Sequence, residues 1–171
     1  VFQDTRLFKE SLLENIRAAR PEASRDEVLS AARAAQCDDI LEKLPQGLDT
    51  VVGTKGIYLS GGEQQRIALA RAILKDAPIV VLDEATAFAD PENEHQIQKA
   101  FEALTKNKTV LMIAHRLSTV QNADSIIVLS DGRVIEQGSH ESLLALHGVY
   151  TGMWEDYQRS AQWKVGKEEA V

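Results

Sequence analysis

The sequence predicts an α/β fold in which a helical subdomain leads into a core built on a parallel sheet. Residues 7–49 are rich in Ala and carry apolar residues at helical spacing. After residue 75 the pattern changes to short apolar runs that alternate with helical segments. The runs Ile79–Leu82 and Thr109–Ala114 are continuously apolar, which is typical of strands that a parallel sheet covers on both faces.

The helical subdomain is predicted from an apolar stripe, a capping box and a clear stop. Residues 12–16 supply the stripe, and Ser24 with Glu27 forms a capping box ahead of a second helix. Pro and Gly at 45–47 end the helical pattern, and residues 50–59 form a linker punctuated by glycines.

The next helix starts sharply and carries the first candidate site. Ser60 and Glu63 form a second capping box, and apolar residues three and four apart continue to Lys75. Gly61 and Gly62 stand in its first turn, where glycine costs about 1 kcal/mol per residue if helical. A capped surface helix would leave that cost unexplained, whereas a phosphate approaching the helix N-terminus would need the space.

The core is predicted to continue with helices and a hairpin. Asp90-Pro91 is typical of a helix start, and Ser118 is expected to cap a short helix. Residues 125–136 predict a hairpin with a tight turn at Asp131-Gly132, and the tail from Ser139 onward is helical. The inward positions of the helix that follows Asp90 are expected at Ile97, Phe101 and Leu104.

Composition excludes several classes of protein. Nineteen basic and 26 acidic residues give a net charge of −7, with no basic stripe, so nucleic acid is not an expected partner. The apolar runs are strand-sized and too short to span a bilayer. The single Cys37 has no partner for a disulfide and no ligand neighbour for a metal site. Because the chain opens Val-Phe-Gln without Met, we expect residue 1 to lie inside a longer protein.

Polar residues follow both predicted core strands. Asp83 and Glu84 stand at the carboxyl end of the first, where open α/β sheets place their ligands. One could hold Mg²⁺ while the other orients or deprotonates a water, although a strand end can also carry acids simply for solvation. His115 follows the second strand and would face the same crevice. The remaining histidines are expected to be structural or exposed: His95, His140 and His147.

Together these residues resemble the nucleotide-binding domain of ATP-binding cassette (ABC) proteins, a P-loop NTPase-like fold. Residues 59–66 look like the signature motif, and residues 79–84 look like Walker B with the catalytic glutamate. Further matches resemble the Q-loop glutamine, the end of the D-loop, the switch histidine, the exporter loop and the exporter ending: Gln3, Ala89-Asp90, His115, residues 50–56 and residues 131–141.

The resemblance implies ATP hydrolysis at a head-to-tail dimer interface, with ATP and Mg²⁺ as ligands. Glu84 would be the general base and His115 would contact the γ-phosphate, while Asp83 and Gln3 would hold the metal. Nucleotide-contacting positions would be Gln3, Ser60, Gly61, Gly62, Glu63, Asp83 and Asp90. Expected partners are a second nucleotide-binding domain, identical or different, and a transporter's membrane domain. The expected location is the cytoplasmic face of the cell membrane, within an integral membrane transporter.

Three positions depart from the family pattern. Glu63 stands where Gln is usual, which places a negative charge near a γ-phosphate unless it turns back to its own backbone. The D-loop reads Ala87-Phe88-Ala89-Asp90 where Ser-Ala-Leu-Asp is common, and this variant resembles that of exporter-fold transporters linked to siderophore traffic. Thr54 stands where exporters prefer Glu.

The largest departure is that no G-x-x-x-x-G-K-[ST] occurs, so we expect Walker A upstream of Val1. The chain would then be a partial ABC ATPase domain, N-terminal part missing, with a helical subdomain over about 4–75 and a core portion over 76–171. Alone it is expected to be inactive and to expose an apolar sheet face. Two alternatives stay open: a non-hydrolysing module that supplies the signature half-site to a partner, and an ABC importer ATPase subunit.

Overall fold

The computed structural model describes residues 6–53, 57–83, 91–114 and 117–168. The chain divides into two compact units, Val1–Ile113 and Ala114–Val171, and each is described by itself. Within the described residues, no helix combines the length and the apolar character that a bilayer span requires. Gln3, Glu84, Asp90 and His115 lie outside the described residues.

The first unit is mostly helical. Its described helices are α1 (Leu12–Arg17), α2 (Arg25–Ala34), α3 (Asp38–Lys43), the 3₁₀ helix η1 (Gly47–Asp49), α4 (Gly61–Lys75) and α5 (Pro91–Thr105). Both predicted capping boxes are present, because in each the Ser side chain accepts from the N3 amide while the N3 Glu accepts from the Ser amide. These caps explain why α2 and α4 begin where they do.

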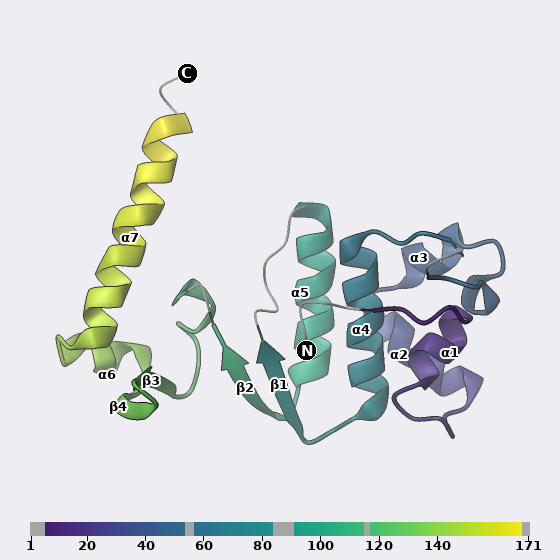
Figure 1. The fold of residues 1–171 in the computed structure, drawn as a ribbon, viewed down its shortest axis with the longest axis horizontal. Helices are drawn as coiled ribbons and strands as arrows, with labels where there is room; N and C mark the ends of the chain where they lie inside the picture. Colours follow the sequence, from purple (N-terminus) through teal and green to yellow (C-terminus); the bar gives the residue numbers. More distant parts are fainter. Residues whose placement is uncertain (1–5, 54–56, 84–90, 115–116, 169–171) are drawn as a thin grey trace. The chain divides into compact units, whose positions relative to one another are not determined.

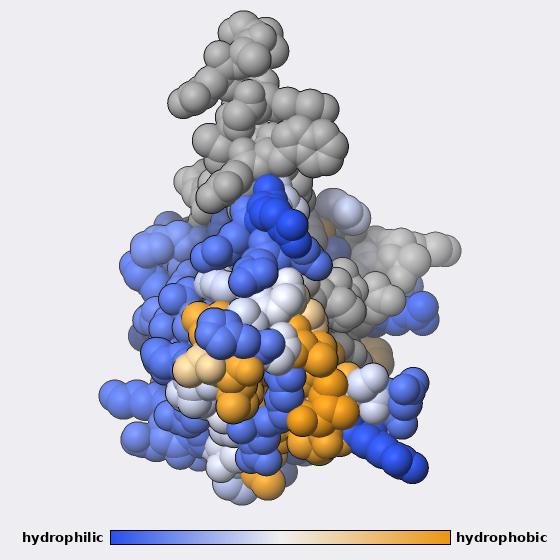
Figure 2. All heavy atoms as spheres, turned by 90° about the vertical axis from the view of Figure 1, so that its left-hand side faces the viewer, coloured by the Kyte–Doolittle hydropathy of each residue, from blue (hydrophilic) through white to orange (hydrophobic). Residues whose placement is uncertain are grey.

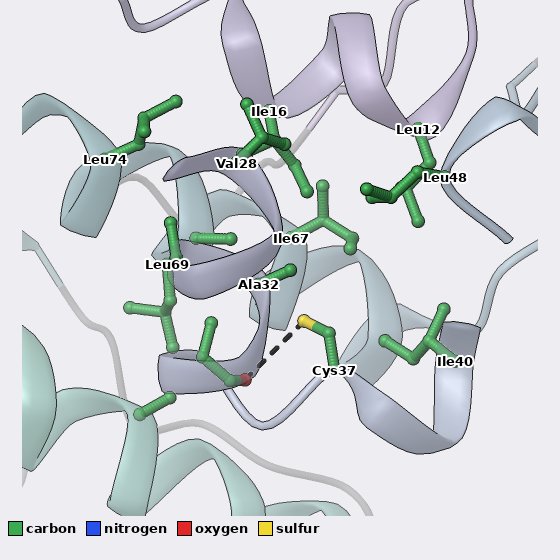
Figure 3. Packing of buried hydrophobic residues seen from close by; sticks show 14 of the residues in the cluster. Leu12, Ile16, Val28, Ala32, Cys37, Ile40, Leu48, Ile67, Leu69 and Leu74 are labelled. Carbon is green, nitrogen blue, oxygen red and sulfur yellow. Dashed lines mark hydrogen bonds between the residues drawn. The ribbon is translucent and has the colours of Figure 1, made fainter. Parts of the chain in front are cut away.

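α4 is the central helix of this unit. It contacts α1 and α2 on one side and α5 on the other (Figure 1). Ile67, Leu69 and Leu74 of α4 are buried with the apolar stripes of α1 and α2 (Figure 3). Fully burying such a side chain stabilises the fold by about 1.5–3 kcal/mol, so the core fixes α4 firmly behind its exposed N-terminus.

The two core strands of this unit pair in parallel, as predicted. β1 (Ile79–Asp83) runs beside β2 (Thr109–Ile113), with Val81 opposite Leu111 and Asp83 opposite Ile113. Leu82 is buried, whereas Val81 is 50% exposed and Leu111 is 54% exposed. The expected apolar face is therefore open among the described residues, and burial on the other face is confined to Val80 and Leu82 of β1, since every residue of β2 is exposed.

The second unit is a hairpin with two helices. β3 (Ile126–Ser130) and β4 (Arg133–Gly138) pair antiparallel, followed by α6 (His140–Ala145) and α7 (Val149–Glu168). Asp131 and Gly132 have φ of 49° and 73°, so the predicted tight turn uses the left-handed region at both central positions. The expected cap at Ser118 is wrong, because Ser118 lies inside the 3₁₀ helix η2 (Leu117–Thr119).

A small core and a side-chain cap on α7 help to hold the second unit together. Ile126, Val128, Leu143 and Tyr150 are buried against one another. Glu136 of β4 accepts hydrogen bonds from the Val149 and Tyr150 amides at 2.5 and 2.9 Å, which satisfies the first turn of α7. The unit also exposes apolar side chains, and Figure 2 shows apolar groups gathered among hydrophilic ones on one face of the molecule. The exposed large apolar residues of the hairpin are Ile127, Leu129, Val134 and Ile135.

Candidate functional site

The described part of the candidate site is the N-terminus of α4. Ser60 is the N-cap, and its Oγ accepts from the Glu63 amide at 3.3 Å. Glu63 Oε2 accepts from the Ser60 amide at 2.7 Å, and the Gln64 side chain donates to the Leu59 carbonyl at 2.7 Å. These contacts hold the chain before the helix in a defined conformation and form the capping box that the sequence predicted.

The amides of Gly61 and Gly62 make no hydrogen bond to another described residue. They belong to the first turn of a 15-residue helix, where backbone N–H groups have no partner within the helix. The aligned peptide dipoles also place partial positive charge at this end. Because Ser60 and Gly61 are exposed, an anion could reach these donors.

The two glycines are needed for different reasons. A Cβ built on Gly62 would lie 2.7 Å from Asn93 Cγ of α5, so Gly62 lets the two helices approach closely. A Cβ on Gly61 would meet nothing within 4 Å. Packing among the described residues therefore explains Gly62 but leaves Gly61 as the position where an outside group would need the space.

Glu63 turns back to its own backbone and is also paired with a lysine. Its Oε1 accepts from Lys43 Nζ of α3 at 2.8 Å, and its side chain is only 10% exposed. Burial by itself raises the pKa of Glu63, but the hydrogen bonds from Lys43 and Ser60 outweigh burial and lower it. The carboxylate is thus ionised, and its charge is offset locally. Sequence reasoning missed Lys43, which lies 20 residues away in another helix.

A second ion pair joins the same two helices. Arg66 of α4 is buried and donates to both carboxylate oxygens of Asp39 at 2.7 and 2.8 Å, and also to the Gln36 carbonyl. Its Nη2 lies 3.5 Å from Asn93 Oδ1, the side chain that packs against Gly62. Hydrogen bonding by Arg66 lowers the pKa of Asp39 despite the opposing effect of burial.

The far side of α4 is tied to the segment that follows residue 5. Arg71 donates to the Asn15 carbonyl and to Asn15 Oδ1, both at 2.7 Å, and to the Arg6 carbonyl at 3.0 Å. Asn15 is fully buried, and its side-chain amide donates to the carbonyls of Phe8, Glu10 and Ser11. This network links the path of residues 6–11 to α4, and a sequence pattern could not show it because its members are up to 65 residues apart.

The predicted metal position is described only in part. Asp83 ends β1 at the carboxyl edge of the sheet, as expected for a ligand site in an open α/β sheet. A carboxylate and an amide oxygen, from Asp83 and Gln3, are donors of the type that Mg²⁺ prefers. The described residues contain no cluster of three His, Cys, Asp or Glu side chains suited to a metal.

Comparison with known proteins places the chain in a family. The family model described as "ABC transporter" matches residues 1–87, just over half of the 171 residues. The mycobactin import ATP-binding/permease protein IrtA of Mycolicibacterium thermoresistibile is 51% identical over 161 residues, 94% of this chain and 18% of that protein. An ATP-dependent lipid A-core flippase of Legionella pneumophila is 51% identical over 158 residues, 92% of this chain and 27% of that protein.

A solved structure agrees with the sequence comparisons. A bacterial Atm1-family ABC exporter with ATP bound matches 90% of this chain and 27% of its own, with a TM-score of 0.78 and 46% identity. This chain spans only about a fifth to a quarter of the length of these relatives. Its fold corresponds to a fragment of an ABC exporter's ATPase domain, and the chain belongs to the ABC transporter family.

Proposed function

We propose that this chain is the C-terminal portion of an ABC ATPase domain that binds and hydrolyses ATP, facing a second such domain, to power an exporter-type transporter. The observation that carries the proposal is the N-terminus of α4. It combines amides at Gly61 and Gly62 that no other described residue pairs, an open space at Gly61, and a carboxylate at Glu63 whose charge is already offset. A helix N-terminus with these features is suited to binding a phosphate group.

In this proposal α4 contacts the γ-phosphate of ATP bound mainly by the opposite domain. Ser60, Gly61 and Gly62 supply the hydroxyl and amide donors, and their geometry is set in advance by the capping box. Fixed donors need no reorganisation when charge develops on the transferring group, so they stabilise the transition state more than mobile ones would.

The hydrolytic residues would come from the ends of β1 and β2. Asp83 and Gln3 would hold Mg²⁺, which neutralises phosphate charge. Glu84 would accept a proton from the attacking water, His115 would donate a hydrogen bond to the γ-phosphate, and Asp90 would lie at the dimer interface. Phosphoryl transfer depends mainly on positioning and charge, so each of these groups requires the others in place.

The membrane domain of the transporter is the second proposed partner, with the chain at the cytoplasmic face of the cell membrane. Phe8, Val51, Ile57 and Tyr58 are exposed apolar residues, and the backbone bridges Ser11 to Val51 and Val52 to Ile57 bring their segments together. An exposed apolar patch of this kind is suited to a protein contact. The named relatives include a mycobactin import protein and a lipid A-core flippase, so ATPase domains of this type serve transporters with different cargo.

We further propose the division of the chain into a helical subdomain over about 4–75, which ends with α4, and a core portion over 76–171. The open apolar face of β1 and β2 supports a partial domain, since a further layer of the same domain would cover it. Walker A would belong to that remaining part of the domain.

The test uses the complete polypeptide that carries this chain. Glu84→Gln keeps the shape of the side chain but removes the base, so ATP turnover should fall about 10²- to 10⁴-fold while ATP binding survives. Dimers with trapped ATP should then accumulate, as measured by analytical ultracentrifugation. Turnover within a few fold of the parent would refute the role of Glu84.

A second variant separates the two half-sites. Gly61→Glu should prevent ATP-driven dimer formation and leave the ATP affinity of the monomer unchanged, because the γ-phosphate it meets is bound by the opposite domain. The matched control is Gly152→Glu on α7, another helical glycine with nothing within 4 Å of a built Cβ, and it should assemble normally. Loss of monomer affinity in Gly61→Glu would instead mean that α4 binds phosphate within its own domain.

A non-hydrolysing half-site module is the alternative. The observation in its favour is the signature-like helix α4, which a module that only supplies a half-site to a partner would also need. It predicts that the complete polypeptide and its Glu84→Gln variant have the same negligible turnover.

A further inference from the structure

Two ion pairs of opposite polarity join α3 and α4. Asp39 and Lys43 are four residues apart on α3, while Glu63 and Arg66 are three apart on α4, so each pair lies on one helix face. Asp39 pairs with Arg66, and Lys43 pairs with Glu63 at 2.8 Å. The short helix α3 therefore presents a negative and a positive group to a positive and a negative group in the first turns of α4.

The two oxygens of Glu63 have separate partners. Oε2 accepts from the Ser60 amide and completes the capping box, whereas Oε1 accepts from Lys43 Nζ. In both pairs the α4 residue is buried and the α3 residue is exposed: Arg66 and Glu63 are 2% and 10% exposed, whereas Asp39 and Lys43 are 61% and 59% exposed. Arg66 holds Asp39 with two hydrogen bonds, while Lys43 reaches Glu63 from the surface with one. Lys43 therefore contributes little to the core, and its main effect is on the charge of Glu63.

That charge matters because of where it lies. Glu63 occupies the third position of the helix, in the same first turn as the amides of Gly61 and Gly62. An unscreened carboxylate there would cancel part of the positive potential at the helix N-terminus and repel an approaching phosphate, whereas an ammonium at 2.8 Å removes most of the carboxylate's field at a distance.

We propose that Lys43 is a positioning residue for the ATP-contacting end of α4, which it serves by neutralising Glu63 and holding its carboxylate toward the Ser60 amide. The inference rests on the proposed function of α4. It explains how a chain with Glu63 in its signature helix can still accept a γ-phosphate. It also implies that Lys43 is needed only while residue 63 carries a charge.

The experiment measures ATP-driven dimer formation in the complete polypeptide with the Glu84→Gln background, so that hydrolysis does not intervene. Lys43→Met should raise the ATP concentration for half-maximal assembly about tenfold, as one uncompensated charge near a phosphate predicts. Lys43→Arg should restore assembly. Lys99→Met, at an exposed lysine of α5, is the control and should behave as the parent.

A second background isolates the charge effect from a merely structural one. In Glu63→Gln the further change Lys43→Met should alter assembly by less than twofold, since no charge is left to offset. Equal assembly of Lys43→Met and the parent would overturn the inference, and so would an equal defect in both backgrounds. If the parent itself fails to assemble with ATP, the proposed function fails and the inference falls with it.

Discussion

The two adjacent glycines of α4 provide the sharpest test of the packing, because the same substitution is predicted to have opposite effects on stability at the two positions. Gly61→Ala and Gly62→Ala add the same methyl group to neighbouring positions of the same first turn. At Gly61 the methyl meets nothing within 4 Å, while at Gly62 it would lie 2.7 Å from Asn93 Cγ and 2.9 Å from Asn93 Cβ. Asn93 must therefore move in one variant only.

The magnitude follows from two opposing effects. Replacing Gly by Ala in a helix stabilises the fold by about 0.5–1 kcal/mol, and this gain is similar at both positions. Overpacking at Gly62 costs about 1–3 kcal/mol, because Asn93 sits on α5 close to Arg66 Nη2 and cannot shift without disturbing that contact. The variants should therefore differ by about 1–3 kcal/mol, with Gly61→Ala the more stable.

Hydrogen exchange followed by mass spectrometry is the suitable assay, since peptides from α4 and α5 report on the first unit alone. A difference of about 1–3 kcal/mol corresponds to roughly 5- to 150-fold faster exchange in Gly62→Ala than in Gly61→Ala. Asn93→Ala should partly relieve Gly62→Ala, because it removes the Cγ contact but keeps Cβ. Equal exchange in the two single variants would refute the packing argument at Gly62.

Three further predictions concern the framework around α4. Arg71→Ala should lower the free energy of unfolding by about 2–3 kcal/mol, since it strips charged hydrogen bonds from buried Asn15; urea denaturation followed by circular dichroism would contradict this if the midpoint did not move. The folded pKa of Asp39 is lowered by Arg66, so this contribution to stability is present above about pH 4 and is lost as pH falls through the folded value; urea midpoints measured from pH 7 to pH 3 should fall less in Asp39→Asn. Burial raises the pKa of Cys37 to about 12, so a disulfide reagent at pH 8 should label it only after denaturation, and rapid labelling of the folded chain would argue against its burial.

Local features were predictable because their signals lie within a few residues. The capping boxes at Ser24 and Ser60 need only a Ser and a Glu three positions apart, and both formed. The turn at Asp131-Gly132 needs two residues that tolerate positive φ, and it also formed. Parallel pairing of β1 with β2 followed from continuous apolar runs separated by a helix.

The contacts that complete the candidate site were not predictable from spacing. Lys43 and Glu63 are 20 residues apart with a linker between them, so their pairing depends on how α3 packs on α4. The distinct reasons for Gly61 and Gly62 depend in the same way on the position of α5. The roles of Gln3, Glu84, Asp90 and His115 stay predictions.

The sequence separations within the two units imply different folding times. The second unit closes through short connections: His140 Nδ1 meets the Tyr150 hydroxyl 10 residues away, and Glu136 caps Val149 13 residues away. In the first unit Arg71 must find Asn15 and Arg6, which precede it by 56 and 65 residues. Folding slows as contacting residues become more distant along the chain, because longer loops must close first. After dilution from denaturant we therefore expect the hairpin and its helices to form early. The contacts of Arg71 with Asn15 and Arg6 are expected to form later.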